Sequence, residues 1–229
     1  MKSPLLLLAC ALAASAQAPA PAVPPAAPSL MNPASLRAKA PDLYRARFTT
    51  TKGDFVIEVD RTWAPRGADR FYNLVTNGFF TDASFFRIVS GFVAQFGIPA
   101  NPNVAAAWQR AIFPDDPVKQ TNRKGTIVFA TAGKNTRTTQ LFINLGNNYD
   151  LDMQGFAPIG RVVEGMEVVQ KLYSGYGESP DQQKIHTQGK EYLDKKYPKL
   201  DSIKSATILG DAPAQPPAGS TAPAEPTKQ

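Results

Sequence analysis

Two apolar runs joined by a short turn stand at residues 85–97, where the chain reads FFRIVSGFVAQFG. Aromatic and β-branched residues dominate both runs, and a serine-glycine pair lies between them, so we predict consecutive strands over 84–89 and 92–96. Successive side chains of a strand point to opposite faces, which directs Arg87 away from its apolar neighbours. The pattern therefore sets one guanidinium, and the carboxamide of Gln95, beside an apolar surface instead of in open water.

Strand-like runs continue on both sides of this stretch. Residues 44–50 and 54–60 alternate Val, Ile and Phe around a Thr-Lys-Gly turn, which predicts a hairpin. Helical periodicity begins at Pro65 and ends at Asn77-Gly78, and a shorter helix is predicted at 166–172. The sequence therefore predicts a mainly β fold, a closed eight-stranded antiparallel β-barrel capped by two helices. The other predicted segments are strands at 126–130, 140–144, 156–163 and 202–209 and a long loop from 98 to about 124.

Composition divides the 229 residues into one domain and two flanking segments. The chain is 43% hydrophobic and 19% charged, which is enough to bury the core of one domain, placed here at residues 44–209. Residues 17–43 are mostly Ala and Pro, and residues 210–229 are again rich in Pro, Ala, Gly and Ser. We expect these segments to be a flexible linker and a disordered tail.

Residues 1–16 have the pattern of a secretory signal peptide. The second residue is basic and supplies the positive charge of such a peptide. Residues 5–14 are its hydrophobic stretch, and the small residues 14–16 form its cleavage site. We expect its removal to leave the protein in the periplasm or outside the cell. The run is far shorter than the roughly 20 apolar residues of a spanning helix, so we expect no membrane span. A lipid anchor on Cys10 is the alternative, since residues 7–10 resemble a lipoprotein cleavage site.

Metal, nucleotide and cysteine chemistry are disfavoured by what the sequence lacks. Cys10 is the only cysteine and His186 the only histidine, so a zinc site built from these two residue types cannot be completed. The sequence contains no Gly-rich phosphate loop followed by Lys and no Gly-x-Ser-x-Gly elbow. We therefore expect no metal and no cofactor, and we interpret His186 as a solvated surface residue.

The net charge of +6 raises the question of a polyanionic partner. The densest basic stretch, residues 184–204, is interleaved with Glu191, Asp194 and Asp201, which is typical of a solvated helix and loop face. We expect a monomer with no nucleic-acid partner. Binding to anionic envelope components is an alternative that the sequence leaves open.

Strand alternation places a second set of side chains. In residues 140–144 it sends the two aliphatic side chains to one face, which we assign to the core. The other face carries Phe142 between Gln140 and Asn144. A large aromatic side chain that met only water there would lose the stabilisation that burial gives. If this strand adjoins the runs at 85–97, one shallow, apolar and donor-rich pocket results. Its lining would be Arg87, Phe92, Gln95, Gln140 and Phe142.

With these residues the chain resembles the cyclophilin-type peptidyl-prolyl cis-trans isomerases, and the similarity covers nearly the whole predicted domain. The resemblance implies an enzyme that accelerates rotation about the bond before proline in exported proteins and so assists their folding. It implies unfolded or partly folded proline-containing polypeptides as partners. The similarity is carried by Ala64-Pro65, FYNL at 71–74, FFRI at 85–88, GFVAQFG at 91–97, GTIVFATAG at 125–133, TQLFI at 139–143 and FAPIGRVVEGM at 156–166.

The resemblance also implies two sets of site residues. Arg87 would be the catalytic arginine, and Gln95 would hold either Arg87 or the substrate carbonyl. Phe92 and Phe142, together with Val93, would form the pocket for the proline ring. The residues that would grip the segment before proline and close the pocket rim are Ala130, Thr131, Gln140, Leu151 and Phe156.

The chain departs from the eukaryotic members of that family at four positions. Phe86 and Phe156 stand where those members usually have histidines, and Thr131 stands where they have asparagine. Asp150 replaces the tryptophan that often precedes their Leu-Asp pair. Because that tryptophan helps relatives to hold cyclosporin, we expect weak cyclosporin binding here.

The chemistry of bond rotation explains the need for an arginine. Rotation about a bond before proline faces a barrier of about 18–20 kcal/mol, because the planar imide is stabilised by resonance. At the twisted midpoint the nitrogen regains its lone pair, so a donor aimed at it binds the midpoint better than either isomer. A non-catalytic module or chaperone that grips proline segments in the same groove is the alternative reading.

Overall fold

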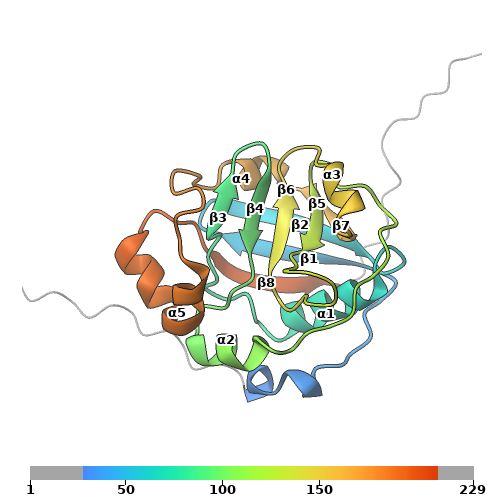
Figure 1. The fold of residues 1–229 in the computed structure, drawn as a ribbon, viewed down its shortest axis with the longest axis horizontal. Coiled ribbons are helices and arrows are strands. Elements are labelled where there is room, and N and C mark those ends of the chain that lie inside the picture. Colours follow the sequence, from blue (N-terminus) through green and yellow to red (C-terminus); the bar gives the residue numbers. More distant parts are fainter. Residues whose placement is uncertain (1–27, 211–229) are drawn as a thin grey trace, which may run out of the picture.

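Eight strands form one antiparallel sheet in the computed structural model, which describes residues 28–210 (Figure 1). The strands are β1 (Leu43–Thr50), β2 (Gly53–Asp60), β3 (Arg87–Val89), β4 (Val93–Phe96), β5 (Thr126–Phe129), β6 (Leu141–Asn144), β7 (Pro158–Glu164) and β8 (Ile203–Leu209). Their order across the sheet is β3-β4-β6-β5-β7-β2-β1-β8. In Figure 1, β3, β4, β6 and β5 run across β1, β2 and β8, so the sheet curls round on itself.

Five α-helices and two short 3-10 turns accompany the sheet in the described part of the chain. The helices are α1 (Pro65–Thr76), α2 (Pro102–Trp108), α3 (Asp150–Met153), α4 (Met166–Gln170) and α5 (Gln182–Lys196), and the turns are η1 (Pro28–Met31) and η2 (Pro33–Ser35). Figure 1 shows α1 at one end of the curled sheet and α5 on the side of β3, away from α3. The proline at the start of α1 and the Asn-Gly pair after it bound this helix as predicted.

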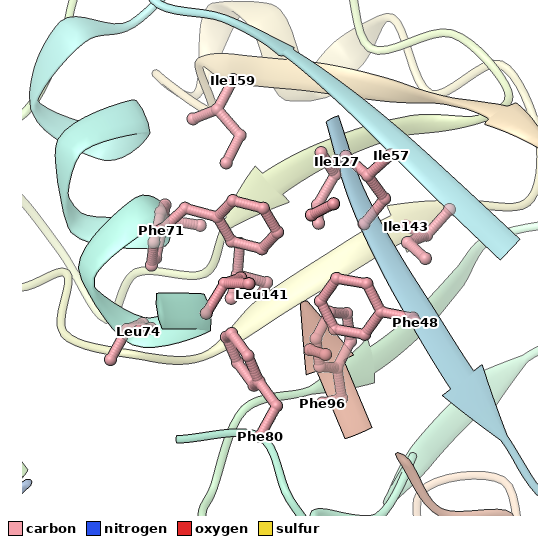
Figure 2. Packing of buried hydrophobic residues seen from close by; sticks show 14 of the residues in the cluster. Phe48, Ile57, Phe71, Leu74, Phe80, Phe96, Ile127, Leu141, Ile143 and Ile159 are labelled. Atoms are coloured by element: carbon pink, nitrogen blue, oxygen red, sulfur yellow. The ribbon is translucent and has the colours of Figure 1, made fainter. Parts of the chain in front are cut away.

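Aromatic rings fill the interior between the two halves of the sheet and α1 (Figure 2). Phe48 of β1 meets Phe96 of β4 edge-on, with 5.9 Å between ring centroids, and Phe71 of α1 lies 6.0 Å from Phe48. Leu141 and Ile143 of β6 point into the same cluster, as strand alternation predicts. Burial of each such side chain contributes about 1.5–3 kcal/mol, so this cluster is the main source of stability.

The sheet is a curled half-barrel, whereas the sequence predicted a closed barrel. The edge strands β3 and β8 share no ladder within residues 28–210. Instead, the segment that precedes β3 contacts the segment that precedes β8. Ser84 and Ser202 form an isolated bridge, and the Phe85 N–H donates a hydrogen bond of 2.9 Å to the Asp201 carbonyl. Only the last three residues of the predicted strand 84–89 enter the sheet, which is why the ladder stops short. The mainly β class and the eight antiparallel strands are confirmed.

α2 and α5 lie outside the two capping helices that the sequence predicted, so the predicted number of helices is too low. α2 lies within the predicted loop 98–124, and α5 overlaps the basic stretch 184–204, which was predicted to be a solvated helix and loop face. α5 is amphipathic, because Ile185 and Leu193 pack on Phe86 while its basic residues face solvent. Gly189 interrupts it with φ +63°, where the Lys190 N–H donates to the Ala100 carbonyl beside α2. α2 has only seven residues, and a short helix leaves a weak periodic signal, which explains why it was missed. The few apolar positions of α5 did not reveal that one side of it packs on the domain.

The segment before β1 contacts the domain although its composition predicts a linker. Leu30 is buried, and its carbonyl accepts a hydrogen bond of 2.9 Å from the indole N–H of Trp108 in α2. The Ala40 N–H donates to Asp69 of α1 at 2.9 Å. The predicted signal peptide, the first part of the predicted linker and the predicted tail from 211 onward lie outside the described residues.

Candidate active site

A row of side chains crosses four neighbouring strands on the face opposite the core. Arg87 of β3 pairs with Gln95 of β4, Gln95 pairs with Phe142 of β6, and Phe142 pairs with Val128 of β5. Residues that pair directly across a sheet point to the same face, so the register places all four side chains together. The residues adjacent to them, such as Ile88 and the aliphatic pair of β6, belong to the core. The predicted adjacency of the two sequence motifs is thus confirmed.

A chain of hydrogen bonds forms the polar end of this row. The Arg87 Nη1 donates to Gln95 Oε1 at 3.2 Å, and the Gln95 Nε2 donates to Gln140 Oε1 at 2.9 Å. The guanidinium also lies over the ring of Phe92, 5.7 Å from its centroid. Gln95 is buried, so its amide has little freedom to turn and holds the guanidinium in place.

An apolar cluster forms the other end of the row. Phe142 is its centre, and the ring of Phe156 meets Phe142 edge-on at 5.6 Å between centroids. Phe92 and Phe156 are half-buried, so the cluster reaches the surface beside Arg87. All of the predicted apolar site residues meet here, and Val128, which the sequence analysis did not select, joins them. The members are Phe92, Val93, Val128, Ala130, Phe142, Leu151 and Phe156.

A buried amide network holds the rim of this cluster. The Asn122 side-chain amide donates to Asp152 Oδ1 at 2.7 Å and to the Phe156 carbonyl at 2.8 Å. On the other side, the Asn148 amide donates to the Phe92 carbonyl at 2.9 Å. Asn122 is fully buried, and each satisfied buried amide resists movement because breaking its hydrogen bonds leaves unpaired groups. The network therefore fixes the two half-buried aromatic residues of the rim.

Asn144 belongs to this network and lies on the same face as Val93, with which it pairs directly, as strand alternation predicts. Its side chain is fully buried and donates to Thr126 Oγ1 at 2.8 Å and to Asn122 Oδ1 at 3.1 Å. The strand ends at Asn144, and the Asn144 Oδ1 accepts a hydrogen bond of 2.6 Å from the side-chain amide of Asn148 in the segment that follows. The polar atoms of Asn144 are therefore engaged within the network.

A recess of about 350 Å³ opens beside the Gln95–Gln140 pair. Four predicted site residues line it, which confirms that they gather at one place. The Thr131 hydroxyl is held within its own loop by the Gly133 carbonyl and Thr136, and the Ala130 N–H donates to the Gln140 carbonyl at 2.9 Å. The full lining is Gln95, Gln109, Ala130, Thr131, Ala132, Thr136, Thr138, Gln140, Gln182 and His186.

Besides Val128, sequence reasoning missed the site residues His186 and Glu178. His186 of α5 is half-buried in the wall of the recess instead of being solvated, and burial lowers its pKa below the usual value. Glu178 accepts a hydrogen bond of 2.6 Å from the Nε of Arg87. The spacing of Gln182 and His186 puts them on one face of a helix, but the sequence does not reveal what that face meets.

Neither a metal centre nor a membrane-spanning helix is found in the described part of the chain. No group of three or more His, Cys, Asp or Glu side chains within residues 28–210 is arranged to hold a metal ion. None of the helices in that range has the length and apolar character needed to cross a bilayer.

Comparisons with known proteins agree with this geometry. The profile of the family described as "Cyclophilin type peptidyl-prolyl cis-trans isomerase/CLD" matches residues 45–190. The chain is 33% identical over 129 residues to peptidyl-prolyl cis-trans isomerase A of Dickeya dadantii, covering 54% of this chain and 68% of that protein. It is 32% identical over 126 residues to peptidyl-prolyl cis-trans isomerase cypE of Dictyostelium discoideum, covering 54% of this chain and 80% of that protein.

A solved structure shares the fold. The crystal structure of a cyclophilin-type peptidyl-prolyl cis-trans isomerase of Cryptosporidium parvum matches with a TM-score of 0.57 at 20% sequence identity. The match covers 74% of this chain and 99% of that one. A second crystal structure of the same Cryptosporidium protein was obtained in the presence of the dipeptide Ala-Pro.

Proposed function

Because the chain belongs to the cyclophilin-type peptidyl-prolyl cis-trans isomerases, we propose that Arg87, Gln95 and the apolar cluster around Phe142 form its catalytic surface. Isomerase activity follows from the family and from the relatives. The roles of individual residues are part of the proposal. The observation that carries it is the cross-strand row, which joins a held guanidinium to an apolar cluster on one face of the sheet.

Arg87 acts on the electrons of the twisted bond. In a planar imide the nitrogen lone pair is delocalised and accepts no hydrogen bond, and it localises on nitrogen as the bond turns. A guanidinium N–H directed at this nitrogen stabilises the midpoint of rotation and neither planar isomer. Gln95 keeps the guanidinium over the Phe92 ring, so the donor needs little reorganisation when the bond turns.

The apolar cluster holds the proline ring while the preceding residue turns. Phe142 and Val93 form the buried base of the cluster, and the half-buried rings of Phe92 and Phe156 are the parts that a pyrrolidine ring can reach first. The recess at Gln140 and Thr131 lies next to this cluster and takes the chain before proline. Fixing one side of the bond leaves rotation of the other side as the remaining motion.

Proline-containing polypeptides are the substrates, and a direct test separates catalysis from binding. We expect the protein to accelerate the exchange between the cis and trans forms of an Ala-Pro tetrapeptide, measured by NMR exchange spectroscopy. A peptide with alanine in place of proline serves as the control and should bind more weakly. Chemical-shift changes on titration without faster exchange would contradict the catalytic proposal and favour a binding module.

Exported proteins are the proposed clients, and the secretory pattern of residues 1–16 supports this part of the proposal. The test is to express the full chain in a bacterial host and to determine the mass of the product in each cell fraction. A periplasmic or secreted product that lacks residues 1–16 is expected. A full-length product in the cytoplasm would contradict export, and a product that begins at a lipid-modified Cys10 would indicate an anchored form.

A further inference from the structure

The segment between α4 and β8, residues 171–202, contacts the catalytic arginine. Glu178 lies in its first loop. Its Oε1 accepts a hydrogen bond of 2.6 Å from Arg87 Nε and forms an ion pair with Arg87 Nη2 at 2.5 Å. The backbone of the same loop is tied to β3, because the Gly177 carbonyl accepts from the Ile88 N–H at 3.3 Å. The carboxylate thus reaches Arg87 from a loop that is attached to the neighbouring residue of the strand.

The hydrogen-bond inventory of Arg87 shows what this carboxylate leaves free. A guanidinium has five N–H groups. Glu178 accepts from the Nε–H, and Gln95 accepts from one Nη1–H. Three N–H groups remain on the two terminal nitrogens, so the group is held at two of its nitrogens and keeps donors for a substrate. A planar guanidinium held at two nitrogens has fewer orientations open to it than a free one.

The loop that carries Glu178 is braced by α5. The Tyr197 hydroxyl donates to the Ser179 carbonyl at 2.8 Å, and the Asp181 N–H donates to the Tyr192 hydroxyl at 3.3 Å. The ring of Tyr197 stands edge-on to those of Tyr176 and Tyr192, at 5.1 and 5.7 Å between centroids. These contacts place the loop backbone, although the Glu178 side chain itself is 64% exposed.

From these contacts we propose that Glu178 is a positioning residue for Arg87, a role that rests on the proposed catalytic function of that arginine. It acts through the guanidinium and touches no substrate atom. Without it, Arg87 keeps the Gln95 hydrogen bond and the Phe92 ring contact but samples further rotamers, so fewer bound substrates meet a correctly aimed donor. Glu178 therefore affects turnover and not substrate affinity.

Three variants test this role. For Glu178→Ala we expect the kcat of Ala-Pro isomerisation to fall about three- to tenfold with KM changed by less than about twofold. Glu178→Gln keeps an acceptor oxygen and should recover most of the activity. Asp194→Ala is the matched control, because it removes the Lys190–Asp194 ion pair from the same segment without touching Arg87, and it should leave kcat unchanged.

A spectroscopic readout separates positioning from general destabilisation. The Arg87 Nε–H should give a slowly exchanging NMR signal in the wild type, in Glu178→Gln and in Asp194→Ala, and this signal should broaden in Glu178→Ala. Unchanged or faster turnover in Glu178→Ala would overturn the positioning role alone, provided that the wild type is active and Arg87→Ala is not. An inactive wild type, or an active Arg87→Ala variant, would overturn both this role and the proposed function.

Discussion

Replacing Arg87 by alanine removes the guanidinium that Gln95 and Glu178 hold over the Phe92 ring. A hydrogen bond from a charged donor contributes about 1.5–3 kcal/mol, and each 1.36 kcal/mol of transition-state stabilisation is a factor of ten in rate. We therefore expect kcat/KM to fall about 10- to 150-fold. The fold should persist, because the ion pair with the mostly exposed Glu178 contributes about 0–1 kcal/mol and the ring contact about 0.5–1 kcal/mol.

The assay compares exchange of an Ala-Pro tetrapeptide by NMR with urea unfolding of the same preparation. Arg161→Ala is the matched control, since Arg161 pairs with Glu58 on the far half of the sheet and should tolerate the change with full activity. Exchange within about twofold of the wild-type rate, with the urea midpoint unchanged, would refute the assignment of Arg87 as the donor.

Three further predictions concern stability and ligand choice. Gly97→Ala should lower the free energy of unfolding by about 2–3 kcal/mol, because Gly97 has φ +102° and a Cβ there would meet the Thr139 carbonyl and lie 2.9 Å from the Gln140 Cα. Gly91→Ala is the comparison: Gly91 has φ +74° but open space around it, so this variant should lose only about 1–2 kcal/mol. Both losses are measured by urea unfolding, and equal losses would refute the steric argument. Burial lowers the pKa of His186, so the unfolded chain binds more protons below about pH 6.5 and stability should fall as the pH drops through that value. His186→Gln should flatten this dependence in urea midpoints at pH 5 and 7, and an unchanged slope would contradict it. Cyclosporin should bind weakly, and a sub-micromolar Kd by calorimetry would show the opposite.

The site could be predicted from the sequence wherever strand alternation controls it. Period-two patterns at 85–97 and 140–144 assign Arg87, Gln95 and Phe142 to one face, and antiparallel pairing then brings them into a single row. The same rule places Asn144 correctly on the face of Val93, but it does not reveal that a buried amide network engages this side chain. Strand positions followed the prediction to within a few residues for the same reason.

Contacts that depend on distant segments could not be predicted. Glu178 stands 91 positions after Arg87, in a loop placed by tyrosine packing against α5, and no local pattern encodes that docking. The buried Leu30 is a similar case, because its Ala- and Pro-rich surroundings have the composition of a linker. Its burial depends on a complementary surface that includes α2.

The separation of the two apolar clusters has a consequence for how this protein can change during evolution. The cluster around Phe142 and the aromatic interior lie on opposite sides of the same four strands, so most side chains belong to only one of them. Substitutions that reshape the outer cluster need not create cavities in the interior, where truncating one side chain typically lowers the free energy of unfolding by about 2–5 kcal/mol. On the proposed function, new preferences among proline-containing sequences can therefore be acquired while the molecule stays folded.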